Sequence, residues 1–171
     1  MLPAMLLSWT AAYSSSSTMT CPPTAATFGQ ACGMKLTATV TAACAEVKEE
    51  MAARVAGQYA SWHDPHNNGT YAVQQYGGNF STSRLTGDQK YTDKQIFSLT
   101  SVDAGCKIEA CSRSQVFSVY DGGTNYCDLK MLFCGSADGC KPVQHDFALA
   151  EAEQTQKFQQ STTALKDCLK V

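Results

Sequence analysis

The 171-residue chain contains nine cysteines, and their spacing restricts its fold more than any other feature. No Cys-x-x-Cys pair occurs, which argues against a zinc ribbon and against a thioredoxin-type redox site. Scattered cysteines in a chain with only 16% charged residues are typical of disulfide-bonded proteins. We therefore predict about four disulfides and one odd cysteine, which leaves a covalent dimer open. The disulfide candidates are Cys21, Cys32, Cys44, Cys106, Cys111, Cys127, Cys134, Cys140 and Cys168.

Two further features favour a secreted protein, or one in the lumen of a secretory-pathway compartment. Asn68-Gly69-Thr70 and Asn79-Phe80-Ser81 match the N-glycosylation pattern in turn-like contexts, so Asn68 and Asn79 are the predicted glycosylation sites. The chain begins MLPAMLLSWTAA, a short apolar run followed by small residues, but it lacks a positively charged start. We predict a signal peptide or its remnant over residues 1–16, the alternative being a disordered tail.

Composition excludes some partners. The formal net charge is −2 and the pI is near 5.9, so the chain lacks the basic surface that nucleic acid requires. No apolar run is long enough to cross a bilayer, so no membrane span is expected. No cofactor motif is present, and we expect no cofactor.

The pattern along the chain predicts one domain. A Ser/Thr/Pro-rich arm occupies residues 17–34, an α+β domain residues 35–145, and a C-terminal segment, tied by Cys168, residues 146–171. Apolar residues recur every three or four positions over residues 40–62 and predict a helix of about 22 residues. Strands are predicted by alternation and by turn residues. They cover residues 70–76, 79–85, 91–100, 106–120 and 126–134.

The last predicted hairpin allows a more detailed interpretation. With Gly122-Gly123 as a two-residue turn, Cys111 lies opposite Cys134, and the hairpin divides into an apolar and a polar face. Cys134 can instead pair with Cys140, and Cys44 of the helix can reach Cys106 or Cys127. Three apolar side chains remain on the polar face and are the candidates for a binding surface. They are Phe117, Tyr126 and Leu132.

One long N-terminal helix packed on a 4–5-stranded antiparallel β-meander resembles the cystatin-like arrangement in topology. The protease-binding Gln-x-Val-x-Gly loop of cystatins is missing, because residues 115–119 read Gln-Val-Phe-Ser-Val. The resemblance therefore implies a fold and no inhibitory activity. The alternative fold is a small lipocalin-like β-barrel.

Few residues of the sequence suggest a metal-binding or catalytic site. His63, His66 and His145 are metal candidates, but the proline between the first two argues against a shared helical face. Asp121, Asn125 and Asp128 cluster near the last turn and can collect a cation weakly, although turn chemistry explains the first two more simply. No nucleophile motif occurs, so no catalytic residue is assigned; the sequence favours a protein without catalytic activity and leaves an enzyme open.

These observations predict a secreted, disulfide-rich binding or structural module that acts on a protein or cell-surface partner. The alternatives are a carrier of a small ligand and an extracellular hydrolase with a dispersed active site.

Overall fold

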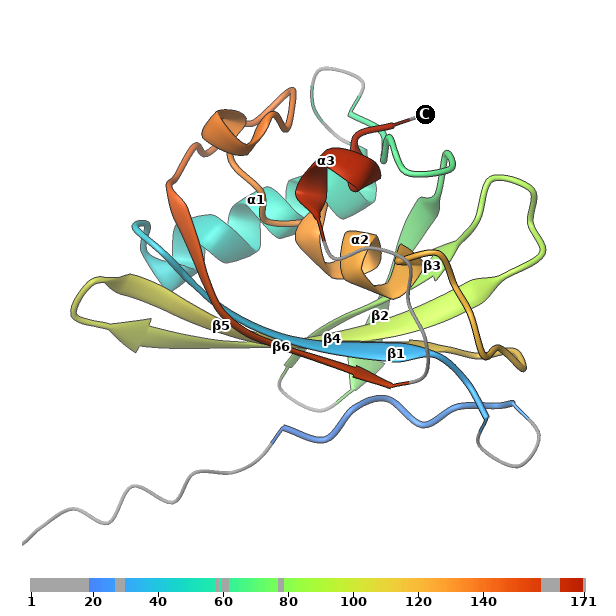
Figure 1. The fold of residues 1–171 in the computed structure, drawn as a ribbon. Helices are drawn as coiled ribbons and strands as arrows, with labels where there is room; N and C mark the ends of the chain where they lie inside the picture. Colours follow the sequence, from blue (N-terminus) through green and yellow to red (C-terminus); the bar gives the residue numbers. More distant parts are fainter. Residues whose placement is uncertain are drawn as a thin grey trace, which may run out of the picture.

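The protein is an antiparallel sheet covered on one face by helices (Figure 1). The computed structural model describes residues 19–26, 30–57, 59, 62–76, 79–157 and 164–170. The signal peptide predicted at residues 1–16 lies outside the described residues. Six strands follow the order β2-β3-β4-β5-β1-β6. The elements are β1 (Gly33–Val40), α1 (Cys44–Ala56), β2 (Thr70–Tyr76), β3 (Asn79–Leu85), β4 (Thr92–Val102), β5 (Gly105–Ser114), α2 (Thr124–Lys130), a 3-10 helix (Ser136–Asp138), β6 (Leu149–Lys157) and α3 (Leu165–Cys168).

The predicted fold class is wrong in two respects. The chain enters the sheet before α1, because residues 34, 36, 38 and 40 are buried in the core while the residues between them are more exposed. This alternation is that of a half-buried strand, so Val40 belongs to β1 and α1 has 13 residues instead of about 22. Gly57 ends α1 in the left-handed conformation. The cystatin-like arrangement of one long helix on a 4–5-stranded meander is therefore not what forms.

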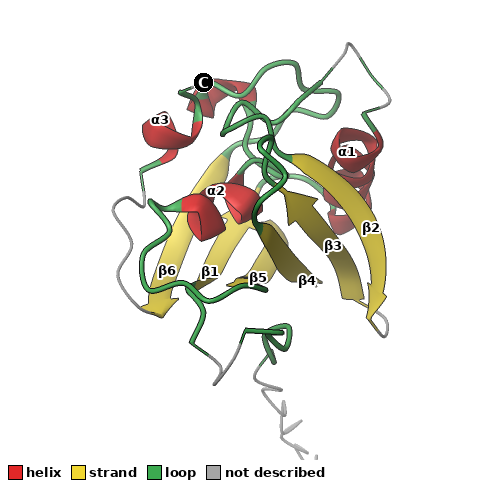
Figure 2. Ribbon diagram, turned by 90° about the vertical axis from the view of Figure 1, so that its right-hand side faces the viewer, coloured by secondary structure: helices red, strands yellow, loops and turns green. Residues whose placement is uncertain are grey.

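The alternative barrel is also wrong. β2 and β6 are the two edges of the sheet in the described part of the chain, so the sheet stays open (Figure 2). β6 was not predicted, and it pairs with β1 in an antiparallel register that shifts between Thr37 and Ala38.

The strand predicted at residues 126–134 is instead the helix α2 and the turn that follows it. Gly122 and Gly123 both have positive φ, 65° and 88°, but they lead into α2 and do not close a hairpin. Every residue of α2 after Thr124 is buried, so the polar face that normally reveals a helical period is missing. Without that hairpin, the predicted pairing of Cys111 with Cys134 does not form.

Four disulfides connect the described elements, as predicted, and they are compatible with an oxidising compartment. They are Cys21–Cys111 (arm to β5), Cys44–Cys106 (α1 to β5), Cys127–Cys168 (α2 to α3) and Cys134–Cys140, which closes a short loop. The odd cysteine is Cys32, which is fully buried and therefore unavailable to a second chain.

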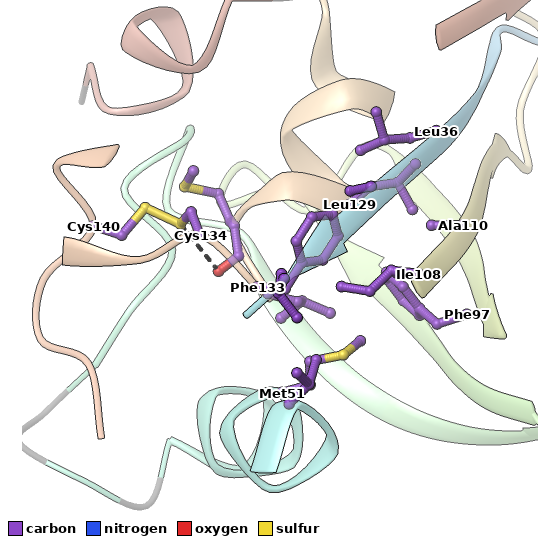
Figure 3. Close-up of a cluster of buried hydrophobic side chains, with 14 of the residues drawn as sticks. Leu36, Met51, Phe97, Ile108, Ala110, Leu129, Phe133, Cys134 and Cys140 are labelled. Atoms are coloured by element: carbon purple, nitrogen blue, oxygen red, sulfur yellow. Dashed lines mark hydrogen bonds between the residues drawn. A yellow bond between two sulfur atoms is a disulfide. The ribbon is translucent and has the colours of Figure 1, made fainter. Parts of the chain in front are cut away.

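The core lies between the helices and the sheet (Figure 3). Met51 of α1 and Leu129 of α2 contribute to it from the helices, and Ile108 of β5 from the sheet. The rings of Phe97 and Phe133 meet edge to face with centroids 6.4 Å apart. No described helix is long and apolar enough to span a membrane.

Candidate functional site

A pocket of about 640 Å³ opens at one end of the sheet. Four parts of the chain line it: the β3–β4 turn with the start of β4, the end of β5 with the segment that follows it, the start of α2, and Asn67 of the loop before β2. Figure 1 shows the first two at the right-hand end of the sheet. The lining residues are Asn67, Thr86, Asp88, Tyr91, Asp93, Ser114, Val116, Phe117, Ser118, Val119, Tyr120, Asp121 and Thr124.

Apolar side chains are concentrated at this pocket. Six large hydrophobic side chains are exposed in the described part of the chain, and four of them line the pocket. Those four are Tyr91 (50% exposed), Phe117 (60%), Val119 (52%) and Tyr120 (58%). Residues 115–120 carry three of them and are called the pocket wall below. Apolar groups gathered around a concave site are typical of ligand binding.

The pocket wall is held by the N-terminal arm. Thr24 Oγ1 donates to the carbonyl oxygen of Ser114 (2.7 Å), and Gln115 Nε2 donates to that of Pro23 (2.9 Å). The backbone N–H of Cys32 donates to Ser118 Oγ (2.9 Å). Because Cys21–Cys111 links the same arm to β5, this disulfide belongs to the support of the pocket.

The opposite side of the pocket is formed by the β3–β4 turn. Thr86 closes the turn, since its backbone N–H donates to the carbonyl oxygen of Tyr91 (3.0 Å) and its Oγ1 accepts from the N–H of Tyr91 (3.1 Å). Asp88 Oδ1 accepts hydrogen bonds from Thr86 Oγ1 and from the Lys90 N–H, and these lower the pKa of Asp88. The turn thus places Tyr91 and an ionised carboxylate at the rim.

Beneath the pocket lies a buried ionic group, which we call the Arg84 cluster: Arg84, Asp64, Asp93 and Asp128. Arg84 Nε bonds Asp64 Oδ2 at 2.6 Å, and Arg84 Nη1 lies 3.3 Å from Asp128 Oδ1. Asp128 Oδ2 also accepts from Gln95 Nε2 and Ser112 Oγ, both at 3.2 Å. Only Asp93 of this cluster lines the pocket, and it is 3% exposed.

The carboxyls of Asp93 and Asp128 hydrogen-bond to each other. Burial raises the pKa of both groups, and the charge of Asp93 raises the pKa of Asp128 further. Burial therefore favours the protonated form of both carboxyls, and because they contact each other, their protons belong to the pair rather than to one residue. One guanidinium thus faces three carboxyl groups, two of which titrate as a pair.

Asp121 stands at the entrance to α2. Its carboxylate accepts from the backbone N–H groups of Gly123 (2.9 Å) and Asn125 (3.1 Å) and so caps the helix. Asn125 Nδ2 donates to Ser114 Oγ (3.0 Å) and to Asp121. Of the three residues that the sequence suggested for a weak cation site, Asp121 lines the pocket, Asn125 lies beside it, and Asp128 is fully buried.

The structure separates the three residues predicted to form a binding surface. Phe117 lines the pocket, but Tyr126 (2% exposed) and Leu132 (0% exposed) lie in the core. Tyr126 extends its hydroxyl to Glu151 Oε1 of β6 (2.9 Å). Tyr126 and Leu132 are therefore unavailable to a partner, because the hairpin that placed them on a polar face is a helix.

The three histidines do not form a metal site in the described part of the chain. His63 is exposed, and His66 Nε2 lies 3.3 Å from Thr124 Oγ1. Burial and then the charge of Arg84 lower the pKa of His66. His145 Nε2 lies 3.5 Å from Glu49 Oε2 of α1, so it belongs to another part of the surface.

The two predicted glycosylation sites are both exposed. Asn68 lies in the turn before β2 with φ of 51°, and Asn79 begins β3. Either side chain is accessible to a modifying enzyme.

Sequence reasoning missed Asp93 and Tyr91 as pocket residues. Both come from the β3–β4 hairpin, which was predicted correctly, but their proximity to residues 114–121 depends on the pairing of β4 with β5. The available signal was a charged residue at an inward-facing position of a strand, since Asp93 shares a face with Gln95 and Phe97.

Comparison with protein-family models, with curated proteins and with solved structures finds no match for this chain.

Proposed function

We propose that this protein is a secreted, disulfide-stabilised binding module that takes a small ligand, or a small group on a larger molecule, into the pocket. The observation that supports this most directly is the concentration of exposed apolar side chains around a cavity of about 640 Å³. This volume falls within the range of roughly 300–1,000 Å³ that is usual for small-molecule sites.

The frame around the pocket suits this role. Disulfides attach the arm to β5 and α2 to α3, so the pocket is built on elements that are covalently connected. A pre-organised site loses less conformational freedom when the ligand binds. The concave shape favours a small bound group over a flat protein surface, and a protein or cell-surface molecule that presents such a group remains the expected partner.

The test is a ligand screen on protein secreted from eukaryotic cells, with a variant that fills the pocket. Val119→Trp adds bulk to the pocket wall, whereas Val73→Trp adds the same bulk to an exposed position on β2 outside the pocket. Native mass spectrometry and thermal shift should find a ligand that binds the wild type and Val73→Trp but not Val119→Trp. If every ligand found binds Val119→Trp equally well, the pocket is not the site.

The same preparation tests the compartment. We expect glycans at Asn68 and Asn79, so removing N-linked glycans should lower the mass, and Asn68→Gln with Asn79→Gln should abolish that change. A secreted protein of unchanged mass would contradict the glycosylation prediction and leave the pocket untouched.

A further inference from the structure

We propose that the ligand of the pocket carries an organic ammonium group, held by the carboxylates of Asp93 and Asp121 and by the aromatic side chains around them. This inference rests on the proposed function and names the chemical class of its ligand.

The charge of the lining points to a cation. Three aspartates line the pocket, and the lining includes no lysine, arginine or histidine. Asp88 forms an exposed ion pair with Lys90 at 3.4 Å, so its charge is partly compensated. Asp93 and Asp121 are close enough for the charge of Asp121 to act on Asp93. A ligand with a positive group placed between them would relieve that repulsion.

The walls favour an organic cation over a metal ion. Tyr91, Phe117 and Tyr120 present aromatic rings at the pocket and are exposed. The face of an aromatic ring attracts an ammonium group, most strongly where water is displaced. A metal ion would require several converging ligand groups, and no set of three is present among the described residues.

An unused acceptor lies directly beside these carboxylates. Asn125 is fully buried and bonds through Nδ2 to Ser114 and Asp121, both of which line the pocket. Its Oδ1 has no hydrogen-bond partner among the described residues. Asn125 does not itself line the pocket, so it acts through its bonds to Ser114 and Asp121, which hold those two residues at the lining.

The cluster below the pocket couples binding to protonation. Three groups face Asp93 from the neighbouring elements: Ser114 of β5, Arg84 of β3 and Asp128 of α2. Asp121 acts on Asp93 from the pocket, and Asp64 pairs with Arg84. A bound cation favours the form in which the Asp93–Asp128 pair has lost its shared proton. Binding of a permanently charged ligand should therefore release a proton to solvent and become tighter as the pH rises. His66 lies near this group, and its protonation at low pH would add to the same trend.

The experiment is calorimetric titration of the full secreted chain with matched pairs of probes. The pairs are choline with its neutral isostere dimethylbutanol, and phenethylamine with phenylethanol. We expect each cation to bind at least about tenfold more tightly than its neutral partner. Asp121→Asn should weaken cation binding by about tenfold; it keeps only one of the two oxygens that accept at the start of α2, so its folding is checked by thermal unfolding. Asp103→Asn removes a charge from the exposed β4–β5 turn and should change nothing.

Two further measurements test whether Phe117 contacts the ligand and whether Asp93 causes the pH dependence of binding. Phe117→Ala should weaken cation binding by about threefold through loss of the aromatic face. Choline affinity should rise with pH in the wild type and become nearly flat in Asp93→Asn, whose folding is checked by its thermal unfolding curve.

The outcomes separate this inference from the proposed function. If neutral probes bind as tightly as cations, or if Asp121→Asn and Asp93→Asn both leave cation affinity unchanged, the ligand class is wrong. If a neutral ligand then binds in a way that Val119→Trp blocks, the pocket function stands without the cation. If Val119→Trp blocks no ligand of either kind, both proposals fail.

Discussion

Two buried ionic clusters of this protein differ in their charge balance. In the Arg54 cluster (Glu50, Arg54 and Tyr59), one guanidinium faces one carboxylate, and both side chains are fully buried. Arg54 also donates to the carbonyl oxygens of Met131 and Cys134, each at 2.8 Å. In the Arg84 cluster, one guanidinium faces three carboxyls, and one of these lies at the pocket.

The two clusters also shift carboxyl pKa values in opposite directions. Burial by itself raises the pKa of Glu50, but hydrogen bonds from Tyr59 and from the His145 N–H, with the charge of Arg54, outweigh it and lower that pKa. At Asp93 and Asp128 burial prevails, and both pKa values are raised. The chain satisfies the first cluster completely, so its role is to fix α1 to residues 131–145. The second places three carboxyl groups around one guanidinium, and burial favours the protonated form of Asp93 and Asp128.

Removal of the guanidinium from the Arg54 cluster should have the largest effect on the stability of the protein. Arg54→Met leaves Glu50 buried without its partner and should lower the free energy of unfolding by about 3–5 kcal/mol at neutral pH. Chemical denaturation measures this loss. The double variant Glu50→Gln with Arg54→Met should recover part of it, because no buried charge is left unpaired. Equal stability of wild type and Arg54→Met would contradict the structural role of this pair.

Removal of a disulfide should also cost different amounts of stability in the two regions. Cys21–Cys111 joins residues 90 positions apart at the pocket end, whereas Cys134–Cys140 spans 6 positions near the Arg54 cluster. The longer loop restricts the unfolded chain more, so its paired Cys→Ser variant should lose about 2 kcal/mol more stability than that of the short loop. Only loss of Cys21–Cys111 should also weaken ligand binding. If both pairs affect binding alike, the arm does not hold the pocket wall.

The opposite pKa shifts predict opposite pH dependences. A raised folded-state pKa means that the stability contributed by Asp128 is fully present below its ordinary pKa near 3.8 and is lost as the pH rises through the folded-state value. Asp128→Asn should therefore gain stability relative to the wild type as the pH rises from 4 to 7, by up to about 1.4 kcal/mol per pH unit.

Glu50→Gln is the matched comparison. The contribution of Glu50 is present above its ordinary pKa near 4.5 and is lost as the pH falls through its lower folded-state value. This variant should be less stable than the wild type at neutral pH, and the difference should shrink in acid. Unfolding curves at several pH values check both variants. If the stability of both variants relative to the wild type changed with pH in the same direction, the predicted difference between the two clusters would be wrong.

The smallest expected effect concerns the pocket wall. Ser118→Ala removes the acceptor of the Cys32 N–H and should cost about 1 kcal/mol of unfolding free energy. It should also speed amide hydrogen exchange in residues 115–120. Ser101→Ala, at an exposed position of β4, is the control and should leave both unchanged. Unchanged exchange in Ser118→Ala would mean that this bond is not what holds the wall.

Local patterns predicted β2, β3, β4 and the start of β5 to within a residue or two at most boundaries, because alternating side chains and turn residues act over short distances. The same patterns did not predict β1, the first strand of the sheet. Val40 fits both the alternation of β1 and the helical spacing of apolar residues in α1. The predicted helix therefore begins at Val40, although α1 begins at Cys44. The pattern predicts a strand where α2 forms, because the burial of α2 on all sides removes the helical period of apolar and polar residues.

The number and spacing of the cysteines already predict four disulfides with one cysteine left over, since both are properties of the chain alone. The sequence also determined most strands of the sheet, through the alternation of side chains. The pairing of the cysteines, in contrast, depends on the folded chain, as does the meeting of Asp93, Phe117 and Asp121 at one pocket. These residues come from β4, from the segment after β5 and from the start of α2. Their proximity depends on strand pairing and on the packing of α2, which no local pattern specifies.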